Sequence, residues 1–241
     1  MTAPSTRGAV VVDGGPGVGP LGRGARGRRP STTRRNVARA ALDCFNARGY
    51  DETTVEEIAA VVGISRRTFF RYYDSKRDVV WGEFDAELVR LEARLQAEAS
   101  DQPMMDVLRR AMVATNQFDP AELEELRIRI RLIGTVPTLV AHAAVLHSRW
   151  CDVVSRFVAG RIGGRPDDLI PQTAARAALG ASVTAFDYWA THRSAVLSDV
   201  LDQTLRLVDV GLGWIEGRDR GPAGAPDVPL RWPDPAVQNG A

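Results

Sequence analysis

The sequence predicts an all-α protein of about nine helices, and three observations support this fold class. Apolar residues recur at helical spacing almost without a break from Thr32 onward. The 241 residues hold no convincing alternation of apolar and polar residues, the pattern of a half-buried strand. Prolines fall where helices should start, because a missing N–H costs least there. They divide the second half into helices expected near 104–117, 121–134, 137–160, 171–192 and 197–216.

A helix-turn-helix pattern follows a first helix that Gly49 ends. In residues 55–62 the apolar side chains recur at i, i+3, i+4 and i+7, as on one face of a short helix. Thr54 is a suitable N-cap, and Glu57 completes a capping box. Gly63 supplies the turn, since a residue without Cβ takes positive φ at little steric cost.

The next short helix has two kinds of side chain, as a recognition helix needs. Ser65 caps it, while Phe69 and Tyr73, four residues apart, can pack inward. An arginine at the start of such a helix can bond a guanine base through two hydrogen bonds. The side chains left to point outward are those of Arg66, Arg67, Thr68, Phe70 and Tyr72.

Residues 53–76 resemble the DNA-binding domain of TetR-family transcriptional regulators. In that family an aromatic run leads into a Ser-Lys pair that opens a fourth helix, and this chain has Phe69-Phe70-Arg71-Tyr72-Tyr73 followed by Ser75-Lys76. Residues 66–70, continued by 78–85, also resemble regulators associated with mycofactocin gene clusters. The resemblance implies an N-terminal three-helix DNA-binding domain and a C-terminal helical domain for ligand binding and dimerisation.

The resemblance also implies roles for single positions. Thr68, Phe70 and Tyr72 match residues that touch bases, thymine methyl groups or phosphates. Lys76 matches a phosphate contact at a helix N-terminus. Phe70 departs from the tyrosine common in the family and therefore loses the hydroxyl hydrogen bond to phosphate. The predicted DNA-binding residues are Thr53, Thr54, Ser65, Arg66, Arg67, Thr68, Phe70, Tyr72 and Lys76. For the first two, capping of the helix alone is the open alternative.

A long fourth helix is expected over residues 75–98, running directly from the recognition helix into the C-terminal half. The resemblance implies that helices four to eight enclose a ligand cavity, and aromatic and methionine side chains suit an apolar ligand. Arg127 and Arg131 lie on one face of the expected helix and Arg129 lies on another. At most one or two of the three would therefore point into the cavity, where they could pair with an anionic head group, for example of an acyl-thioester. Core packing is the open alternative for each apolar residue. The predicted ligand residues are Trp81, Phe84, Met105, Met112, Arg127, Arg131, Trp150, Phe186 and Trp189.

The last two expected helices have the features of a helix–helix interface. Helix 171–192 is rich in alanine, which lets backbones approach, and helix 197–216 has an apolar stripe from Val200 to Leu212. The resemblance implies that these helices form a four-helix interface in a homodimer. A monomeric core explains the same pattern, but two recognition helices on a palindromic operator require two-fold symmetry.

Composition and charge distinguish the two terminal segments from the rest of the chain. Lys+Arg 31 and Asp+Glu 30 nearly cancel, yet residues 1–39 hold eight arginines and one acid. The arginines of the tail can lie along DNA phosphates or be a solvated segment. We expect four parts: residues 1–31 as a disordered basic Gly/Arg tail, 32–76 as the helix-turn-helix DNA-binding domain, 77–216 as the ligand-binding and dimerisation domain, and 217–241 as a disordered tail.

Other classes of protein and site are disfavoured. Cys44 and Cys151 make no disulfide framework, and no apolar run reaches the roughly 18–20 residues of a membrane span, so a cytoplasmic protein is expected. The Gly-x-Gly-x-x-Gly of residues 17–22 opens no helix and so predicts no dinucleotide site. His147 and Cys151 lack a third metal ligand, and no catalytic motif is present. We expect no enzyme activity, metal or cofactor.

The function expected is that of a ligand-responsive transcriptional regulator. A repressor would release its palindromic operator when a small apolar or acyl-type effector binds the C-terminal domain. Three alternatives stay open: a transcriptional activator, an architectural protein that binds DNA without specificity, and a small helical nucleic-acid-dependent enzyme. Specific and scrambled DNA compared over a range of salt concentrations distinguish the specific regulator from the architectural protein.

Overall fold

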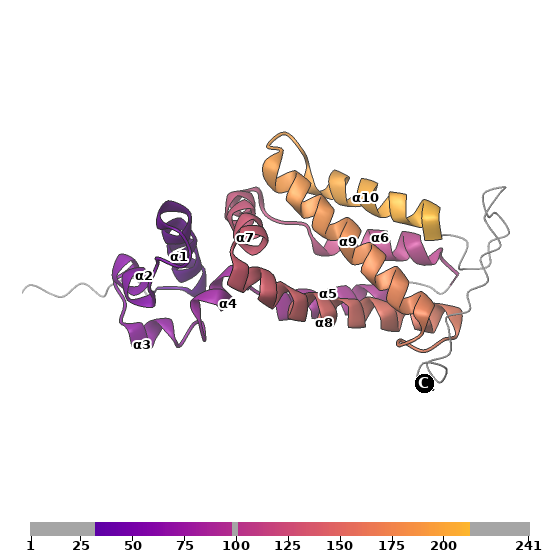
Figure 1. Cartoon of the computed structure of the whole chain (residues 1–241), viewed down its shortest axis with the longest axis horizontal. Helices are drawn as coiled ribbons and strands as arrows, with labels where there is room; N and C mark the ends of the chain where they lie inside the picture. Colours follow the sequence, from indigo (N-terminus) through magenta and orange to yellow (C-terminus); the bar gives the residue numbers. More distant parts are fainter. Residues whose placement is uncertain (1–31, 98–100, 213–241) are drawn as a thin grey trace, which may run out of the picture. The chain divides into compact units, whose positions relative to one another are not determined.

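The computed structural model describes residues 32–97 and 101–212, which form helices and no strand (Figure 1). The predicted all-α fold class is therefore confirmed for this part of the chain. The predicted tails, residues 1–31 and 217–241, lie outside it. Its helices are α1 (Arg34–Arg48), α2 (Val55–Val62), α3 (Arg66–Phe69), α4 (Lys76–Trp81), α5 (Phe84–Ala97), α6 (Met104–Thr115), the 3-10 helix η1 (Pro120–Glu122), α7 (Leu123–Thr135), α8 (Pro137–Ile162), α9 (Leu169–Thr191) and α10 (Leu197–Leu212).

The predicted helix-turn-helix is confirmed in α2, the following turn and α3. At the start of α2 the Thr54 hydroxyl accepts a hydrogen bond from the Glu57 amide at 3.2 Å, and Glu57 Oε2 accepts from the Thr54 amide at 2.8 Å. Gly63 has φ 70° and ψ 32°, a left-handed conformation that favours glycine. The Ser65 hydroxyl then accepts from the Thr68 amide at 3.1 Å and caps α3. Each of these contacts spans three residues or fewer, so local sequence determines the motif.

An apolar cluster that we call the N-terminal core holds α1 to α4 together. Ile58 of α2 and Phe69 of α3 are both fully buried in it. The same cluster includes Ile128 of α7 and Leu139 of α8. The N-terminal core therefore extends past residue 76, where we expected the DNA-binding domain to end.

The predicted long fourth helix over residues 75–98 is wrong, because the chain breaks at Gly82 into α4 and α5. Gly82 has φ 62° and ψ −122°, a backbone conformation that residues with a Cβ rarely adopt. Arg129 of α7 occupies the break and donates hydrogen bonds to the carbonyl oxygens of Val79 and Val80. These carbonyls belong to the last turn of α4, which has no following turn to supply donors. A side chain from a distant helix thus replaces the missing helical hydrogen bonds.

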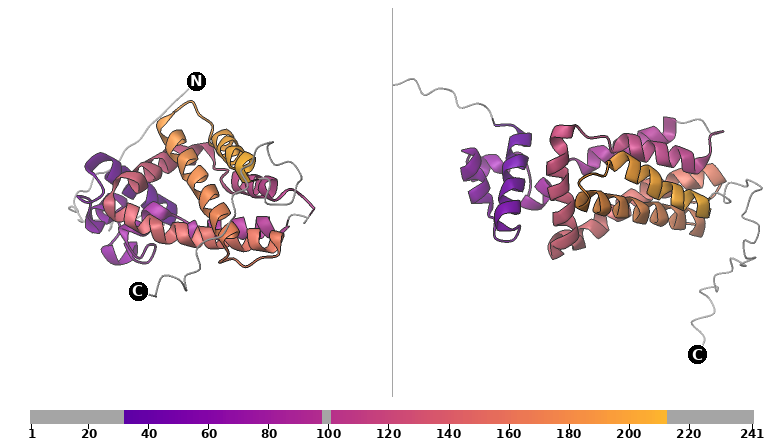
Figure 2. Two further views of the ribbon diagram at one scale, coloured as in Figure 1. Left: turned by 45° about the vertical axis from the view of Figure 1, so that its right-hand side comes forward. Right: turned by 90° about the horizontal axis from the view of Figure 1, so that it is seen from above.

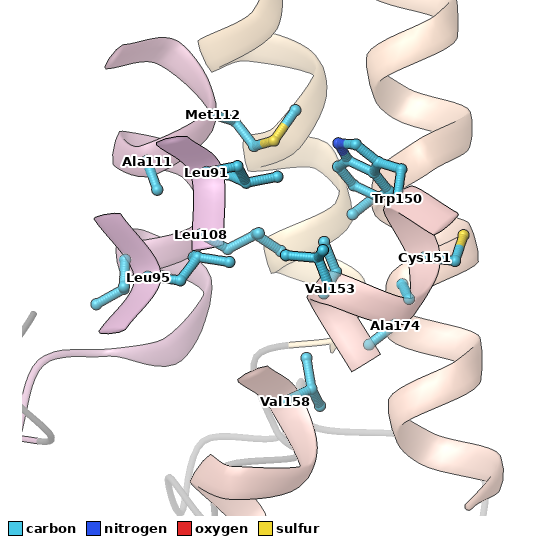
Figure 3. Close-up of a cluster of buried hydrophobic side chains, with 14 of the residues drawn as sticks. Leu91, Leu95, Leu108, Ala111, Met112, Trp150, Cys151, Val153, Val158 and Ala174 are labelled. Carbon is cyan, nitrogen blue, oxygen red and sulfur yellow. The ribbon is translucent and has the colours of Figure 1, made fainter. Parts of the chain in front are cut away.

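The C-terminal helices pack around a second buried cluster. Helix α9 lies against both α8 and α10, and α10 also lies against α6 (Figures 1 and 2). The cluster takes leucines from α5 and α6, Trp150 and Val153 from α8, and alanines such as Ala174 from α9 (Figure 3). Since Ala174, Ala175 and Ala178 are fully buried there, much of the alanine in α9 serves packing within the chain.

Within residues 32–97 and 101–212, no single helix is both long and apolar enough to cross a membrane. The segments Pro120–Thr135 and Pro137–Ile162 meet the length and composition criteria only as a pair, and a bend of 99° separates them.

Candidate nucleic-acid interface and ligand cavity

Helix α3 and the residues that follow it, 66–73, divide their side chains between the core and the surface. Phe69 and Tyr73 are buried, at 0% and 5% exposure, which confirms their predicted packing role. Arg66 and Arg67 are exposed, and Phe70 keeps 40% of its surface accessible. The outward side of α3 therefore offers two guanidinium groups and an aromatic ring to a partner. Such donors suit base edges and phosphates of DNA.

Arg66 already has partners on this surface. Its Nε lies 3.0 Å from Glu56 Oε1 of α2, and its guanidinium lies 5.4 Å from the ring centroid of Phe70. Both members of the ion pair are largely exposed, so the pair contributes little to folding. It does hold the Arg66 side chain over α3, next to Phe70.

Three predicted DNA-binding residues make structural hydrogen bonds at helix starts. Thr53 is 1% exposed, and its hydroxyl donates to the Gly49 carbonyl at 2.8 Å. Thr54 and Ser65 cap α2 and α3 through their hydroxyls, which accept from backbone amides. The capping alternative thus describes what Thr54 does in this structure, and a contact of these residues with DNA stays a prediction.

Tyr72 and Lys76 bond to backbone carbonyls near the recognition helix. Tyr72 is half-buried, and its hydroxyl donates to the Thr32 carbonyl at 2.6 Å. Lys76 Nζ donates to the carbonyls of Tyr50 at 2.7 Å and Thr53 at 3.3 Å, and it lies 4.3 Å from the Tyr50 ring centroid. Burial raises the pKa of Tyr50 to about 12, so its phenol stays neutral beneath the ammonium. Lys76 therefore joins the start of α4 to the segment before α2.

A cavity of about 430 Å³ lies among α4, α5, α6, α7, α8 and α9. Its walls are mainly apolar. Leu91, Met112 and Trp150 line the cavity and are also members of the buried cluster in Figure 3. A volume of this size suits a small molecule. Five of the predicted ligand residues line it: Trp81, Phe84, Met112, Trp150 and Phe186.

The other four predicted ligand residues lie outside this lining. Arg127 is buried, donates to the Trp189 carbonyl and stacks 4.0 Å from the Trp189 ring centroid, which ties α7 to α9. Met105 is buried in the C-terminal cluster. Arg131 is exposed and lies 3.4 Å from Asn46 Oδ1 of α1. Packing or surface contacts account for all four positions.

Arg129 lines the cavity, although only Arg127 and Arg131 were selected from the sequence. It lies with Ile130 and Ile133, which also line the cavity, on one side of α7. Burial lowers the pKa of Arg129, and the nearby carboxylate of Glu125 opposes this effect. An arginine within an inward apolar stripe is the sequence feature that marks such a residue.

Two histidines lie around the Trp81 indole. The rings of His142 and His147 are 6.0 and 6.4 Å from it, measured between centroids. Burial lowers the pKa of His147, which therefore favours its neutral form in the cavity wall. Among the described residues no group of three possible metal ligands occurs, so His147 and Cys151 remain without a third.

Two family models match the chain. Residues 37–80 match "Bacterial regulatory proteins, tetR family", and residues 102–213 match the "MftR C-terminal domain". The first match covers the helix-turn-helix, and the second covers most of the helices that form the cavity. Together they agree with the division of roles between the outward side of α3 and the cavity.

The chain is also similar to individual regulators. It is 38% identical over 186 residues, 77% of this chain and 94% of the relative, to MftR of Mycobacterium tuberculosis, which is named as a proposed transcriptional regulator of mycofactocin biosynthesis. It is 32% identical over 155 residues, 62% of this chain and 69% of the relative, to the transcriptional regulator TcmR of Streptomyces glaucescens. Among solved structures, the TetR-family repressor FadR of Thermus thermophilus with lauroyl-CoA matches with TM-score 0.50 and 23% identity, over 80% of this chain and 99% of that one.

Proposed function

Because the chain belongs to the TetR family of bacterial transcriptional regulators, we propose that it is a repressor whose operator affinity is set by an apolar effector. A DNA-binding transcriptional regulator is what the family membership establishes. The observation that carries the proposal further is the position of α4, which begins at Lys76 beside the helix-turn-helix and ends at Trp81 in the cavity wall.

We assign DNA recognition to the outward side of α3. Arg66 and Arg67 would reach base edges, while Thr68, Phe70 and Tyr72 would supply apolar and phosphate contacts. Lys76 would add positive charge at the start of α4. The protein would act in the cytoplasm, where bacterial DNA lies.

The effector would be a small apolar or acyl-type molecule held in the 430 Å³ cavity. The largely apolar walls support this class, and the fold neighbour FadR was solved with lauroyl-CoA. The effector would lower operator affinity only to the extent that it binds the DNA-free arrangement more tightly. The ligand-binding and dimerisation domain would cover residues 77–216, of which 98–100 and 213–216 lie outside the described part. The DNA-binding domain would cover residues 32–76.

A homodimer through α9 and α10 would present two recognition helices to a palindromic operator. Exposed apolar side chains support it: Leu207 and Val210 of α10 are 70% and 82% exposed. In contrast, Leu201 and Leu205 of the predicted stripe are buried within the chain itself. Leu207→Asp and Val210→Asp should each produce monomers in sedimentation velocity. Val89→Asp on α5, whose wild-type side chain is 67% exposed, is the matched control and should leave the dimer intact.

The proposed function is tested with DNA from upstream of the gene itself. Fluorescence anisotropy should show tighter binding to one palindromic segment than to its scrambled sequence, at every salt concentration. Equal affinity for the two would contradict a sequence-specific repressor. Addition of the correct effector should then weaken binding to the palindrome. An effector that strengthens it would instead indicate an activator or co-repressor mode.

A further inference from the structure

Two buried polar atoms at one end of the cavity lack a partner. Trp81 Nε1 and Thr115 Oγ1 are both shielded from solvent, and within the described residues neither makes a hydrogen bond. An indole N–H can only donate, so it needs an acceptor, and burying it without one is unfavourable. An oxygen of a ligand head group would satisfy such a donor.

A third donor, Arg129, belongs to the same end of the cavity. Trp81, Thr115 and Arg129 all line the 430 Å³ cavity and also a second, more polar cavity of about 740 Å³. The three residues come from α4, α7 and the last residue of α6. They therefore mark the place where an apolar compartment meets a polar one.

Arg129 also holds the end of α4. Its Nη1 donates to the Val80 carbonyl at 2.8 Å and to the Val79 carbonyl. A Cβ at Gly82 would lie 3.1 Å from this nitrogen, so the glycine leaves room for the guanidinium. A group that engages Arg129 from the cavity side would compete with these two carbonyls.

We propose that Trp81, Thr115 and Arg129 form the recognition site for an oxygen head group of the effector, a carboxylate or carbonyl at the end of an apolar body. The proposal rests on the effector role given above and adds the head-group chemistry. The apolar body would lie against Phe84, Met112 and Trp150, and the head group would accept hydrogen bonds from the three polar residues.

Binding of this head group would loosen the end of α4. A charge-assisted hydrogen bond to a carboxylate is stronger than one to a neutral carbonyl, so the head group would draw Arg129 from Val79 and Val80. Glu87 lies in the same wall and opposes an anion when charged. Burial raises the pKa of Glu87, which favours its protonated form and weakens this opposition.

The head-group chemistry is tested with three probes that share one apolar chain: decanoate, methyl decanoate and decylamine. Isothermal titration calorimetry without DNA should show binding of decanoate and the ester, and at least about tenfold weaker binding of the amine, which cannot accept a hydrogen bond when protonated. Decanoate binding tighter than the ester identifies a carboxylate, and the reverse identifies a carbonyl. Equal affinity for all three, or no binding of either oxygen probe, would overturn the proposal.

Two variants assign the effect to these residues. Thr115→Val replaces the hydroxyl with a methyl group of similar size and should weaken decanoate binding by about 2- to 10-fold, while Arg129→Met should weaken it by at least about tenfold. Arg131→Met, on the same helix but with its wild-type side chain exposed outside the cavity, is the matched control and should bind as the wild type does. Circular dichroism checks that each variant is folded, and Thr115→Val keeps the test valid if Arg129→Met unfolds. Unchanged decanoate affinity in Thr115→Val and in folded Arg129→Met would contradict the assignment.

The loosening of α4 has its own measurement. Decanoate should speed hydrogen–deuterium exchange of amides in residues 79–84 of the wild type, and unchanged or slower exchange there would contradict the coupling. Operator binding without any probe is measured separately. A protein that binds the operator but no oxygen probe refutes this inference alone, and one that binds decanoate but no specific DNA refutes the proposed function alone.

Discussion

The helix-turn-helix takes its residues from one continuous segment, whereas the cavity takes its walls from six helices. The caps of α2 and α3 link residues three apart, Thr54 with Glu57 and Ser65 with Thr68. The cavity instead joins Trp81 to residues as distant as Phe186. Local hydrogen bonds allow the helix-turn-helix to be predicted from its own residues. The shape of the cavity instead depends on packing between helices that are distant in the sequence. Substitutions should therefore act locally in one region and at a distance in the other.

The largest contrast should come from two neighbours at the end of α3, its last residue Phe69 and its C-cap Phe70. Phe69→Ala removes a fully buried ring from the N-terminal core and should destabilise the protein by about 3–5 kcal/mol. Phe70→Ala, at a 40% exposed position, should change stability by less than about 1 kcal/mol and act on operator affinity instead. Urea unfolding measures both changes. Similar losses of stability in the two variants would mean that α3 does not separate core from surface in this way.

The break between α4 and α5 can be tested next. Gly82→Ala places a Cβ at positive φ and 3.1 Å from Arg129 Nη1, so it should cost about 1–3 kcal/mol of stability. Gly160→Ala in α8 is the control, because its Cβ would meet no atom within 4 Å. That variant should gain about 0.4–1 kcal/mol from reduced unfolded-state entropy. Thermal unfolding compares them, and a Gly82→Ala protein as stable as the wild type would show that the break tolerates a side chain.

A change on the outward side of α3 should affect DNA binding and leave folding intact. Arg67→Ala should lose about 1–3 kcal/mol of specific operator affinity, or about 5- to 150-fold, if Arg67 contacts a base. Arg165→Ala is the control, since Arg165 is exposed in the segment between α8 and α9 and pairs with Asp167 at 3.0 Å. Anisotropy titrations measure both variants. A loss shared equally by operator and scrambled DNA would assign Arg67 to phosphate instead of base contact.

The smallest effect should be a pH dependence of the capping box. The hydrogen bond from the Thr54 amide lowers the pKa of Glu57, so the charged carboxylate stabilises the folded state. This stability is present above the ordinary glutamate pKa and is lost as the pH falls through the lower folded value. Glu57→Gln should remove that part of the acid dependence in thermal unfolding. Thr54→Ala keeps the backbone amide and should retain most of it, so an equal loss in both variants would point to the hydroxyl.

The sequence was sufficient to predict α2, the turn and α3, because the capping residues, Gly63 and the spacing of apolar residues each act over a few residues. It failed at Gly82, where regular apolar spacing on both sides favoured one continuous helix. The break depends on Arg129, 47 positions further along the chain, to bond the Val79 and Val80 carbonyls. Nothing within residues 75–98 records that contact.

The sequence predicted which types of residue line the cavity, but it predicted less well which positions do so. Met105 and Trp189 are as apolar as Met112 and Trp150, yet the first two are not in the cavity lining. A core and a cavity wall use the same side chains, so composition cannot separate them. For α7 the sequence distinguished the face of Arg127 and Arg131 from that of Arg129, but the tertiary packing decided which face meets the cavity.

The reach of the N-terminal core into α7 and α8 has a consequence for building hybrid regulators. Ile128 and Leu139 belong to the same buried cluster as Ile58 and Phe69, although about 60 to 80 positions separate the two pairs in sequence. A chimera joined at residue 76 would set a foreign α7 and α8 against this cluster. Transplanting the DNA specificity of this protein therefore requires that the recipient match the volumes at positions 128 and 139.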